Sequence, residues 1–566
     1  MRLQTGGARR RYMERSDMGR KLWLSIAVLA IGAGLLVAAG VASPASSGNA
    51  KAGAVTAKKG GTLRLSKSTD VDYVDPALAY FTDTWELQYI TQAKLYNYPD
   101  KGGAAGAQPV PEIAKKTTIS KDGKTYTFLL WNNYKYNTGR TVQAVDFANA
   151  FVRDADPKMQ SPATTYMHEI VGADAAIDGK TSTISGIKAV GKFKLVFHLT
   201  RALPDFESRL TMPFFSPVPP GTPHDPDGIN NPPSAGPYYV ASRDVNRQLI
   251  IKSNPNYKGK RPHNVSQIIW TIGPSLEACQ LQTEQNQTDY CVDGISPAAY
   301  KSISDKYGIN KPNGQFFFYT LLGTSYYALN MSRPAFKGNL AFRKAVNTAI
   351  DRPALVRQGG FLGGKRTDQI LPPAMTKNVD IYPIRGANPT AAKKLATGHM
   401  PAGNKLTLYT ANRGARLLRA QVFQFDMQQI GIDTTVQTFA RAVEHAKCGT
   451  RSEPFDVCDE GWVVDYADPV TFFEPLLDGN NIHDTENSNE SYFNDPKWNK
   501  QIEAAGRLTG AARATAYTNL DINITKQAAP WASFLNLTQR DFVSKSTGCY
   551  LFHPVFLMDW AVTCKK

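Results

Sequence analysis

The longest apolar run of the chain, residues 22–42, lies close to its beginning. Arginine and lysine residues precede this run, and small residues with one proline follow it. A positive, then apolar, then small-residue order is typical of an export signal. A run of about 20 apolar residues also spans a bilayer, so we expect residues 1–45 to be either a cleaved signal or a retained membrane anchor. Residues 46–60 follow as a tether, and the true start is either Met1 or Met18.

Short alternating patterns in the first half of the exported part predict strands and one helix. A strand begins at residues 61–65, and apolar residues then recur at helical spacing over residues 84–95. Residues 121–124 read Lys-Asp-Gly-Lys, a turn typical of a β-hairpin. Strict alternation over residues 193–199 and a short apolar segment at 268–272 predict two further strands.

The second half of the chain changes to a helix-and-strand pattern. Apolar residues share one helical face over residues 342–350. A strand at 406–409, a helix at 416–430 that stops at Gly431, and a strand at 434–439 then form a βαβ unit. Such a unit predicts a parallel sheet covered by helices, and hence an α/β fold.

Composition and charge narrow the classes of function. The chain has 566 residues, 42% of them hydrophobic, and a formal net charge of +17, which is a globular composition. Residues 1–45 account for +5 of this charge and leave +12 for the remainder, where the basic residues are scattered. Without a dense basic helix or an aromatic-basic alternation, we expect no nucleic-acid partner.

The six cysteines favour an oxidising compartment. They lie as three close pairs along the chain, and their spacing fits neither C-x-x-C nor a Cys/His metal site. Six cysteines allow 15 connectivities, and proximity along the chain suggests Cys279–Cys291, Cys448–Cys458 and Cys549–Cys564. With no cysteine near the export signal, a thioether lipid anchor at the mature N-terminus is excluded.

Catalytic and metal motifs are incomplete wherever they begin. His168-Glu169 lacks the second histidine that a zincin helix needs four residues after the first. The glycine-rich segment at 359–366 ends in Arg366 where a phosphate-binding loop needs serine or threonine. No G-x-S-x-G elbow occurs. We therefore predict no catalytic and no metal-binding residues, although a triad assembled only by folding stays open.

Four separated stretches, at 111–147, 236–257, 342–352 and 455–469, carry a resemblance to a known family. The first contains Ile119-Ser120-Lys121-Asp122-Gly123-Lys124-Thr125-Tyr126-Thr127-Phe128, and the last contains Gly461-Trp462-Val463-Val464-Asp465-Tyr466-Ala467-Asp468-Pro469. In this order they resemble the family 5 extracellular solute-binding proteins. These are the oligopeptide, dipeptide and nickel receptors of ATP-binding-cassette (ABC) importers, and the resemblance covers about residues 60–566.

The resemblance implies an α/β fold in the form of a two-lobed, periplasmic-binding-protein-like clamp with hinge crossings and an extra inserted domain. The expected division is lobe I at 61–96, 185–273 and 530–566, the inserted domain at 97–184, and lobe II at 274–529. Chain crossings near Ile269 and Trp531 would form the hinge. Closure of such lobes is driven only by contacts that exist in the closed state.

The resemblance also implies a set of ligand-binding residues. Asp465 lies where peptide-binding members place an aspartate that pairs with the ligand's α-ammonium, a charge-assisted bond. The further expected contacts are Trp462 and Tyr466 beside it, Tyr80, Phe81, Thr82 and Trp85 after the first strand, and Asn330. For each of these residues the alternative is ordinary packing or capping. Arg343 and Asp351 are expected to support the fold.

We therefore expect a receptor that captures a short peptide between two lobes and delivers it to the membrane subunits of an ABC permease, without enzyme activity or cofactor. A nickel chelate, a sugar or another small organic solute is the alternative ligand. A secreted hydrolase is the alternative of another class, and steady consumption of peptide or ester mixtures would reveal it. We expect a monomer that is exported to the extracellular space or cell envelope, and membrane association through residues 22–42 stays open.

Overall fold

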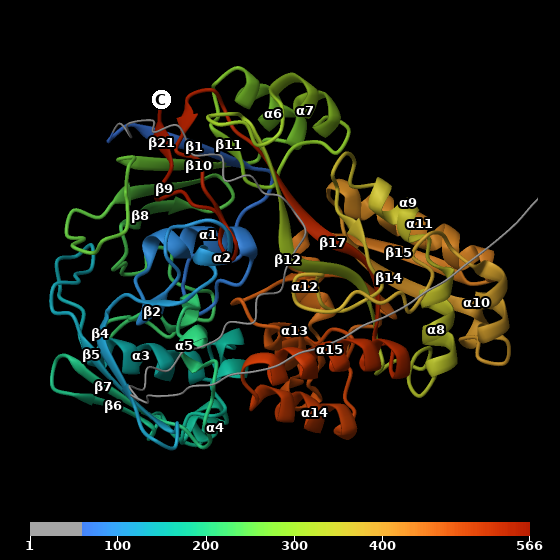
Figure 1. Cartoon of the computed structure of the whole chain (residues 1–566), viewed down its shortest axis with the longest axis horizontal. Helices are drawn as coiled ribbons and strands as arrows, with labels where there is room; N and C mark the ends of the chain where they lie inside the picture. Colours follow the sequence, from blue (N-terminus) through green and yellow to red (C-terminus); the bar gives the residue numbers. More distant parts are fainter. Residues whose placement is uncertain (1–58) are drawn as a thin grey trace, which may run out of the picture. The chain divides into compact units, whose positions relative to one another are not determined.

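Strand β1 (Thr62–Lys67) lies inside a five-stranded sheet of the computed structural model, which describes residues 59–566 (Figure 1). The sheet has the order β11-β1-β10-β9-β8. Its other strands are β8 (Tyr238–Asp244), β9 (Gln248–Ser253), β10 (Gln267–Ile272) and β11 (Tyr290–Cys291). Both neighbours of β1 run parallel to it, while β9 is antiparallel to β10 and β8. The strands predicted at 61–65 and 268–272 are thus present and pair with each other, and we call this part the first lobe.

Helix α1 (Thr82–Thr91) is shorter than the helix predicted over residues 84–95. The backbone of Gln92 is extended, and the amide of Gly236 donates a hydrogen bond to the carbonyl oxygen of Thr91 at 2.9 Å. A longer helix would need that oxygen for its own next turn. Leu95 is buried as predicted, but in the extended segment that leads to β2 (Tyr96–Asn97).

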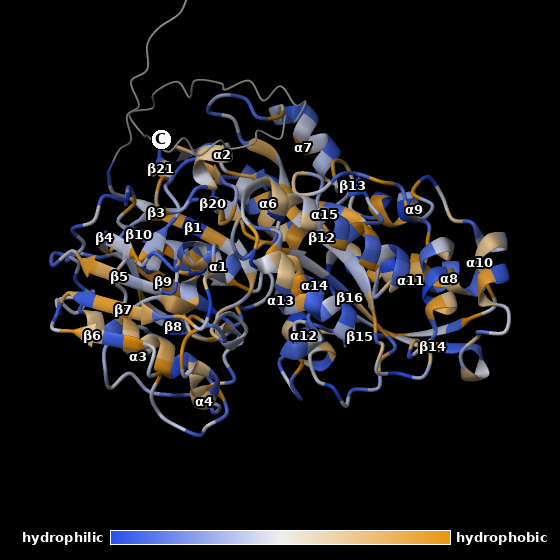
Figure 2. Cartoon of the chain, turned by 60° about the horizontal axis from the view of Figure 1, so that its bottom comes forward, coloured by the Kyte–Doolittle hydropathy of each residue, from blue (hydrophilic) through white to orange (hydrophobic). Residues whose placement is uncertain are grey.

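A four-stranded antiparallel sheet of order β4-β5-β7-β6 forms the inserted part. Its strands are β4 (Ala114–Ile119), β5 (Thr125–Leu130), β6 (Ile187–Val190) and β7 (Lys194–His198), and α3 (Ala144–Ala155) packs against β6 and β7. The predicted hairpin joins β4 to β5, and Gly123 takes the positive φ of +70° that its turn requires. Figure 2 shows hydrophobic segments on β6, β7 and α3. We expected the inserted part to end at residue 184, but it extends beyond that residue. Strands β6 and β7 follow residue 184 and belong to the same sheet, because β7 pairs along β5.

The second lobe contains a six-stranded sheet of order β13-β17-β12-β16-β14-β15. The predicted βαβ unit is present as β14 (Lys405–Ala411), α11 (Gly414–Gln429) and β15 (Asp433–Phe439), with β14 parallel to both β15 and β16 (Val457–Val463). The helix predicted over 342–350 is α8 (Leu340–Ala349). The carboxylate of Asp351 accepts a hydrogen bond from the amide of Ala354 and so caps α9 (Arg352–Arg357). The guanidinium of Arg343 donates to the carbonyl of Ala528 at 2.7 Å, as expected for a residue that supports the fold.

Two long antiparallel strands, β12 (Phe316–Leu329) and β17 (Trp531–Phe542), connect the lobes. Beyond β17, Val543 forms a bridge with Tyr290 of the first sheet, and residues after it return to the first lobe. The lobe boundaries that we expected, at 273–274 and 529–530, therefore assign two strands to the wrong lobe. Strand β11 belongs to the first sheet because it pairs with β1, and β17 belongs to the second because it pairs along β12.

Shorter elements complete the chain. In the first lobe and inserted part they are α2 (Gly103–Gly106), β3 (Val110–Pro111), η1 (Pro162–Tyr166), α4 (Ala173–Ile177), α5 (Phe206–Arg209), η2 (Pro213–Phe215) and α6 (Leu276–Glu284). The others are α7 (Tyr300–Tyr307), β13 (Lys365–Arg366), α10 (Pro389–Ala396), η3 (Ala402–Asn404), α12 (Arg441–Cys448), α13 (Val470–Leu477), η4 (Gly479–Asn481), α14 (Pro496–Gly506), α15 (Gly510–Gln527), β18 (Thr547–Gly548), β19 (Phe552–His553), β20 (Leu557–Met558) and β21 (Cys564–Lys565).

All three suggested disulfides form. Cys279–Cys291 joins α6 to β11, Cys448–Cys458 joins α12 to β16, and Cys549–Cys564 closes a loop near the C-terminus. The predicted signal or anchor and nearly all of the tether lie outside the described residues. Between residues 59 and 566, no helix combines the length and the apolar character needed to cross a membrane.

Candidate ligand-binding site

A cavity of about 830 Å³ lies between the two lobes and is lined by residues of both. From the first lobe, its wall is formed by the segments that follow the parallel strands β1, β10 and β11. From the second lobe, it is formed by the segments that follow β14, β15 and β16, which are also parallel. The carboxyl ends of parallel strands are where open α/β sheets bind ligands. Both sheets therefore direct this edge into one shared cavity.

Asp72 holds the first-lobe wall in place. Its carboxylate accepts hydrogen bonds from the amides of Tyr80 at 2.6 Å and Phe81 at 2.7 Å, and from the hydroxyl of Thr84. These bonds fix the segment that leads into α1, so that Tyr80, Phe81 and Thr82 line the cavity. Burial raises the pKa of Asp72, while the three hydrogen bonds act in the opposite direction.

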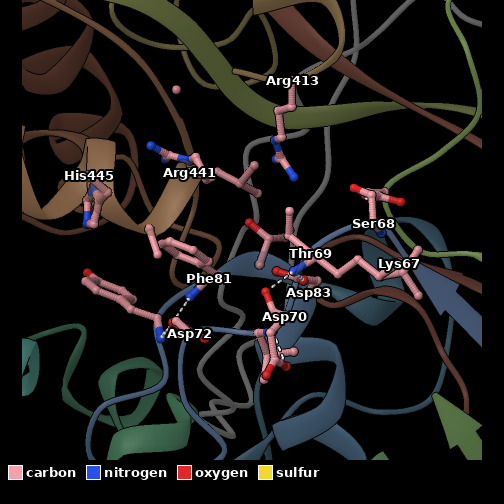
Figure 3. Close-up of a pocket in the computed structure, with 18 of the residues that line it drawn as sticks. Lys67, Ser68, Thr69, Asp70, Asp72, Phe81, Asp83, Arg413, Arg441 and His445 are labelled. Atoms are coloured by element: carbon pink, nitrogen blue, oxygen red, sulfur yellow. Dashed lines mark hydrogen bonds and ion pairs between the residues drawn. The ribbon is translucent and has the colours of Figure 1, made fainter. Parts of the chain in front are cut away.

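Aromatic side chains from both lobes meet across the cavity. Tyr80 packs edge-to-face against Trp462 of β16, with 5.5 Å between ring centroids. Phe81 lies 5.5 Å from the guanidinium of Arg441 and 5.8 Å from the ring of His445, both on α12 (Figure 3). Four of the predicted contacts, Tyr80, Phe81, Thr82 and Trp462, therefore line the same cavity from its two sides.

Asp465 follows β16 and lies at the aromatic end of the cavity. The side chain is 3% exposed, and its carboxylate accepts a hydrogen bond from the hydroxyl of Tyr166 at 2.6 Å. The hydroxyl of Tyr80 lies 3.2 Å from that of Tyr166. Burial raises the pKa of Asp465 to about 7, although the hydrogen bond from Tyr166 favours the ionised form. A carboxylate in this setting lacks a cationic partner among the described residues.

Arg413 is one of the cavity residues that the sequence did not predict. It follows β14 directly, and its side chain makes no hydrogen bond or ion pair with a described residue. Figure 3 shows it extending from the second lobe toward Thr69 and Asp83. The surrounding protein and the nearby guanidinium groups of Arg441 and Arg416 lower the pKa of Arg413. Its position after the first strand of the predicted βαβ unit is the signal that could have identified it.

A network of buried charges forms the rest of the second-lobe wall. The guanidinium of Arg441 donates to both carboxylate oxygens of Glu460 at 2.8 Å and to Glu444 at 2.5 Å. His445 Nδ1 lies 3.5 Å from Glu460 and 3.0 Å from Glu490. We call this network the α12 charge cluster; its members are Glu444, Asp459, Glu460 and Glu490 with Arg416, Arg441 and His445.

Three predicted contacts lie outside the cavity lining. The indole of Trp85 donates to the carbonyl of Ala79 at 2.8 Å and packs on Phe214. Asn330 is fully buried, and its amide bonds to Phe455 and Ser332. Tyr466 is fully buried and donates to Asp205 at 2.6 Å. In each case the polar atoms are already used by the protein, which is the packing or capping alternative considered above.

Comparison with known proteins agrees with this architecture. A family model described as bacterial extracellular solute-binding proteins, family 5 middle, matches residues 108–484. The chain is 26% identical over 470 residues to a dipeptide-binding protein of Lactococcus lactis subsp. cremoris, covering 76% of this chain and 81% of that protein. It is 24% identical over 528 residues to the periplasmic oligopeptide-binding protein OppA of Escherichia coli, covering 87% of this chain and 91% of that protein.

Solved structures show the same fold. A clavulanic acid biosynthesis oligopeptide binding protein 2 aligns with a TM-score of 0.77 at 24% identity, covering 90% of this chain and 96% of that one. The murein tripeptide binding protein MppA of Escherichia coli aligns with a TM-score of 0.75 at 22% identity, covering 90% and 99%. The predicted two-lobed α/β clamp is thus confirmed. Because the family model matches well over half of the length of this chain, the chain belongs to the bacterial extracellular solute-binding proteins of family 5.

Proposed function

We propose that this protein captures a short peptide with free termini between its two lobes and delivers it to the membrane subunits of an ABC importer. The observation that carries this proposal is the pair of opposite charges on the cavity wall. Asp465 offers a buried carboxylate, and Arg413 offers a guanidinium without an ion-pair partner among the described residues. A zwitterionic peptide has one complementary charge for each of them.

The α-ammonium of the peptide would pair with Asp465. Enclosing an ammonium with a carboxylate gives a charge-assisted hydrogen bond, and removing one partner of such a pair costs about 2–5 kcal/mol. The aromatic rings of Tyr80, Phe81 and Trp462 exclude water from this end, which strengthens the interaction. Binding would also place a cation beside a buried carboxylate that has no basic partner among the described residues.

The carboxylate end of the peptide would pair with Arg413. Three guanidinium groups, those of Arg413, Arg416 and Arg441, converge near this part of the cavity, and only Arg413 lacks an acidic partner among the described residues. An anion placed there relieves their mutual repulsion. Between the two ends, hydrogen bonds to an extended main chain would leave side chains largely free, as in other modes of extended-peptide recognition.

The relatives support a peptide as the ligand. Those reported above are named as dipeptide-, oligopeptide- and murein peptide-binding proteins, and a solved structure of similar fold is titled as a complex of Helicobacter pylori DppA with the peptide STSA. We further propose that the protein is exported to the cell envelope, acts there as a monomer and performs no catalysis.

Titration calorimetry with a tripeptide tests the proposal. We expect the wild-type protein to bind a tripeptide with free termini, and Asp465→Ala to bind it at least about 30-fold more weakly. The N-acetylated tripeptide is the matched control, because it lacks the ammonium. Mass spectrometry of the peptide released from the protein after incubation should show that the peptide is intact. Unchanged affinity in the variant would refute the role of Asp465, and steady peptide hydrolysis would refute the receptor function.

A further inference from the structure

Glu490 is a buried carboxylate at the cavity wall with too few partners. Its side chain is 3% exposed, and Oε1 accepts no hydrogen bond from a described residue. Among residues 59–566, its one basic neighbour within 4 Å is His445, whose Nδ1 lies 3.0 Å away but is not aligned for a hydrogen bond. A carboxylate buried in this way is costly unless a donor or a cation reaches it.

Within 4 Å, the α12 charge cluster around Glu490 contains more carboxylates than basic groups. It contains four carboxylates, Glu444, Asp459, Glu460 and Glu490, but only three basic groups, Arg416, Arg441 and His445. Both arginines are directed at the other carboxylates: Arg441 is bidentate to Glu460, and Arg416 lies 3.8 Å from Asp459, Glu444 and Glu460. Glu490 is therefore the carboxylate of the cluster that no described arginine approaches within 4 Å.

The surroundings raise the pKa of both Glu490 and His445. Burial and the neighbouring Glu460 raise the pKa of Glu490 well above its usual range. Burial lowers the pKa of His445, but the carboxylates of Glu460 and Glu490 outweigh it and raise that pKa to about 10.

We infer that Glu490 and His445 mark a subsite for a cationic side chain, so that this receptor prefers peptides that carry lysine or arginine at one position. The inference rests on the proposed peptide-binding function and specifies its substrate class. An ammonium or guanidinium would supply hydrogen-bond donors to the unpartnered Oε1 of Glu490, and such charge-assisted bonds are the strong ones. Glu490 and His445 both line the cavity, so a ligand side chain reaches them without unfolding any element.

A divalent metal ion fits the cluster less well. The side chains of His445, Glu460 and Glu490 offer ligand atoms within 4.8 Å of one another. However, both oxygens of Glu460 are held by Arg441, whose positive charge opposes a metal ion at the same place. The geometry therefore favours an organic cation.

Matched tripeptides test the inference by calorimetry. Lysine is compared with norleucine, which has a similar length and no charge, at each position of an otherwise all-alanine tripeptide. We expect lysine to bind at least about tenfold more tightly than norleucine at one position, because hydrogen bonds to charged groups are worth at least that factor. Glu490→Gln should reduce this ratio to about threefold or less. The matched control is Glu486→Gln, an exposed glutamate four residues earlier, which should leave the ratio unchanged.

Three outcomes separate the inference from the proposed function. Equal affinity for lysine and norleucine peptides at every position overturns the inference and leaves the peptide receptor intact. Absence of binding for all peptides overturns both. Binding of Zn²⁺ or Ni²⁺ alone that is lost in Glu490→Gln, together with no lysine preference, replaces the subsite with a metal site. The wild-type peptide series decides the question even where Glu490→Gln fails to fold.

Discussion

The hydroxyl of Tyr466 donates a hydrogen bond to Asp205 Oδ2 at 2.6 Å, and this bond joins the loop after β16 in the second lobe to the segment before α5 in the first. Arg209 of α5 extends the same contact, because its guanidinium donates to Glu474 of α13 at 2.7 Å. Arg513 of α15 lies 3.8 Å from Asp205. These contacts involve residues outside the cavity lining, so they hold the lobes together independently of a ligand.

The first prediction concerns this contact between the lobes. Tyr466→Phe removes one hydrogen bond to a buried carboxylate, worth about 1.5–3 kcal/mol, only from the state in which the lobes touch. We expect the variant to open, so that the radius of gyration of the ligand-free protein rises in X-ray scattering and peptide affinity falls about 10-fold.

The matched control for this variant is Tyr409→Phe. The hydroxyl of Tyr409 donates to Glu453 at 3.2 Å, and both residues lie in the second lobe. This control also removes a tyrosine–carboxylate bond, but it should leave the scattering radius unchanged. An equal radius for Tyr466→Phe and wild type would show that the Tyr466–Asp205 bond does not favour closure.

The second prediction concerns the cost of keeping Asp465 buried. Because burial raises its pKa from 3.8 to about 7, the folded protein holds a proton that the unfolded chain releases above about pH 4. The contribution of Asp465 to the free energy of unfolding therefore falls as the pH rises from about 4 to 7, and it stays low above pH 7. Asp465→Asn removes this dependence. We expect the stability advantage of the variant over wild type to grow by about 2–3 kcal/mol between pH 5 and pH 8.

Urea unfolding of the ligand-free proteins at the two pH values measures this difference. Other buried carboxyls, such as Asp426 and Asp521, also have pKa values raised to about 7 by burial, but they contribute equally to both proteins and cancel. Asp484→Asn, at an exposed position, serves as the control and should show no advantage at either pH. If the free energies of unfolding of Asp465→Asn and wild type differ by the same amount at both pH values, the pKa of Asp465 is not raised. Gained stability together with lost peptide affinity is expected for a binding residue.

Local patterns predicted the elements of the fold, because each depends on residues close in sequence. The βαβ unit over residues 405–439 follows from its periodicity and from the stop at Gly431. The ends of α1 could not be predicted in the same way. That helix stops at Thr91 because Gly236, distant in sequence, takes the hydrogen bond of its last carbonyl.

The candidate site was predicted in part, for a similar reason. Trp462 of β16 and Asp465 just after it lie in a stretch whose sequence resembles the family, and both line the cavity. Tyr466, next to Asp465, points away from the cavity because its hydroxyl bonds to Asp205. That partner lies 261 positions earlier in the chain, so local sequence does not reveal it. Arg413 belongs to no recognised motif, and its role depends on which cavity groups are left without partners. Such a count of partners needs the folded chain.

The third prediction concerns the carboxylate end of the ligand. Arg413→Gln should weaken the binding of a tripeptide with a free C-terminus at least about tenfold, and the loss should shrink for the C-terminally amidated peptide. Since Arg413 makes no ion pair among the described residues, the melting temperature should change little. Arg366→Gln, at an exposed position of β13, is the control for the change of charge. Equal losses for the free and amidated peptides would refute the pairing with a terminal carboxylate.

The fourth prediction concerns the disulfide Cys448–Cys458, which fastens the end of α12 to β16. Replacing both cysteines by alanine frees a loop with a sequence separation of 10 and should lower the free energy of unfolding by about 2–3 kcal/mol. Because α12 carries Arg441 and His445 and β16 carries Glu460, the same change should loosen the α12 charge cluster and weaken peptide binding.

The double variant Cys549→Ala/Cys564→Ala provides the comparison. It frees a loop of similar size, with a sequence separation of 15, whose one cavity residue is Leu557. Both double variants should melt at lower temperature, since each loses a loop constraint of similar entropy. Peptide affinity is then measured by calorimetry at a temperature where both double variants are folded. Only the variant without Cys448–Cys458 should bind peptide more than about threefold more weakly than wild type. Equal affinities would mean that α12 and β16 stay in register without the disulfide, through contacts such as the bonds of Arg441 to Glu460.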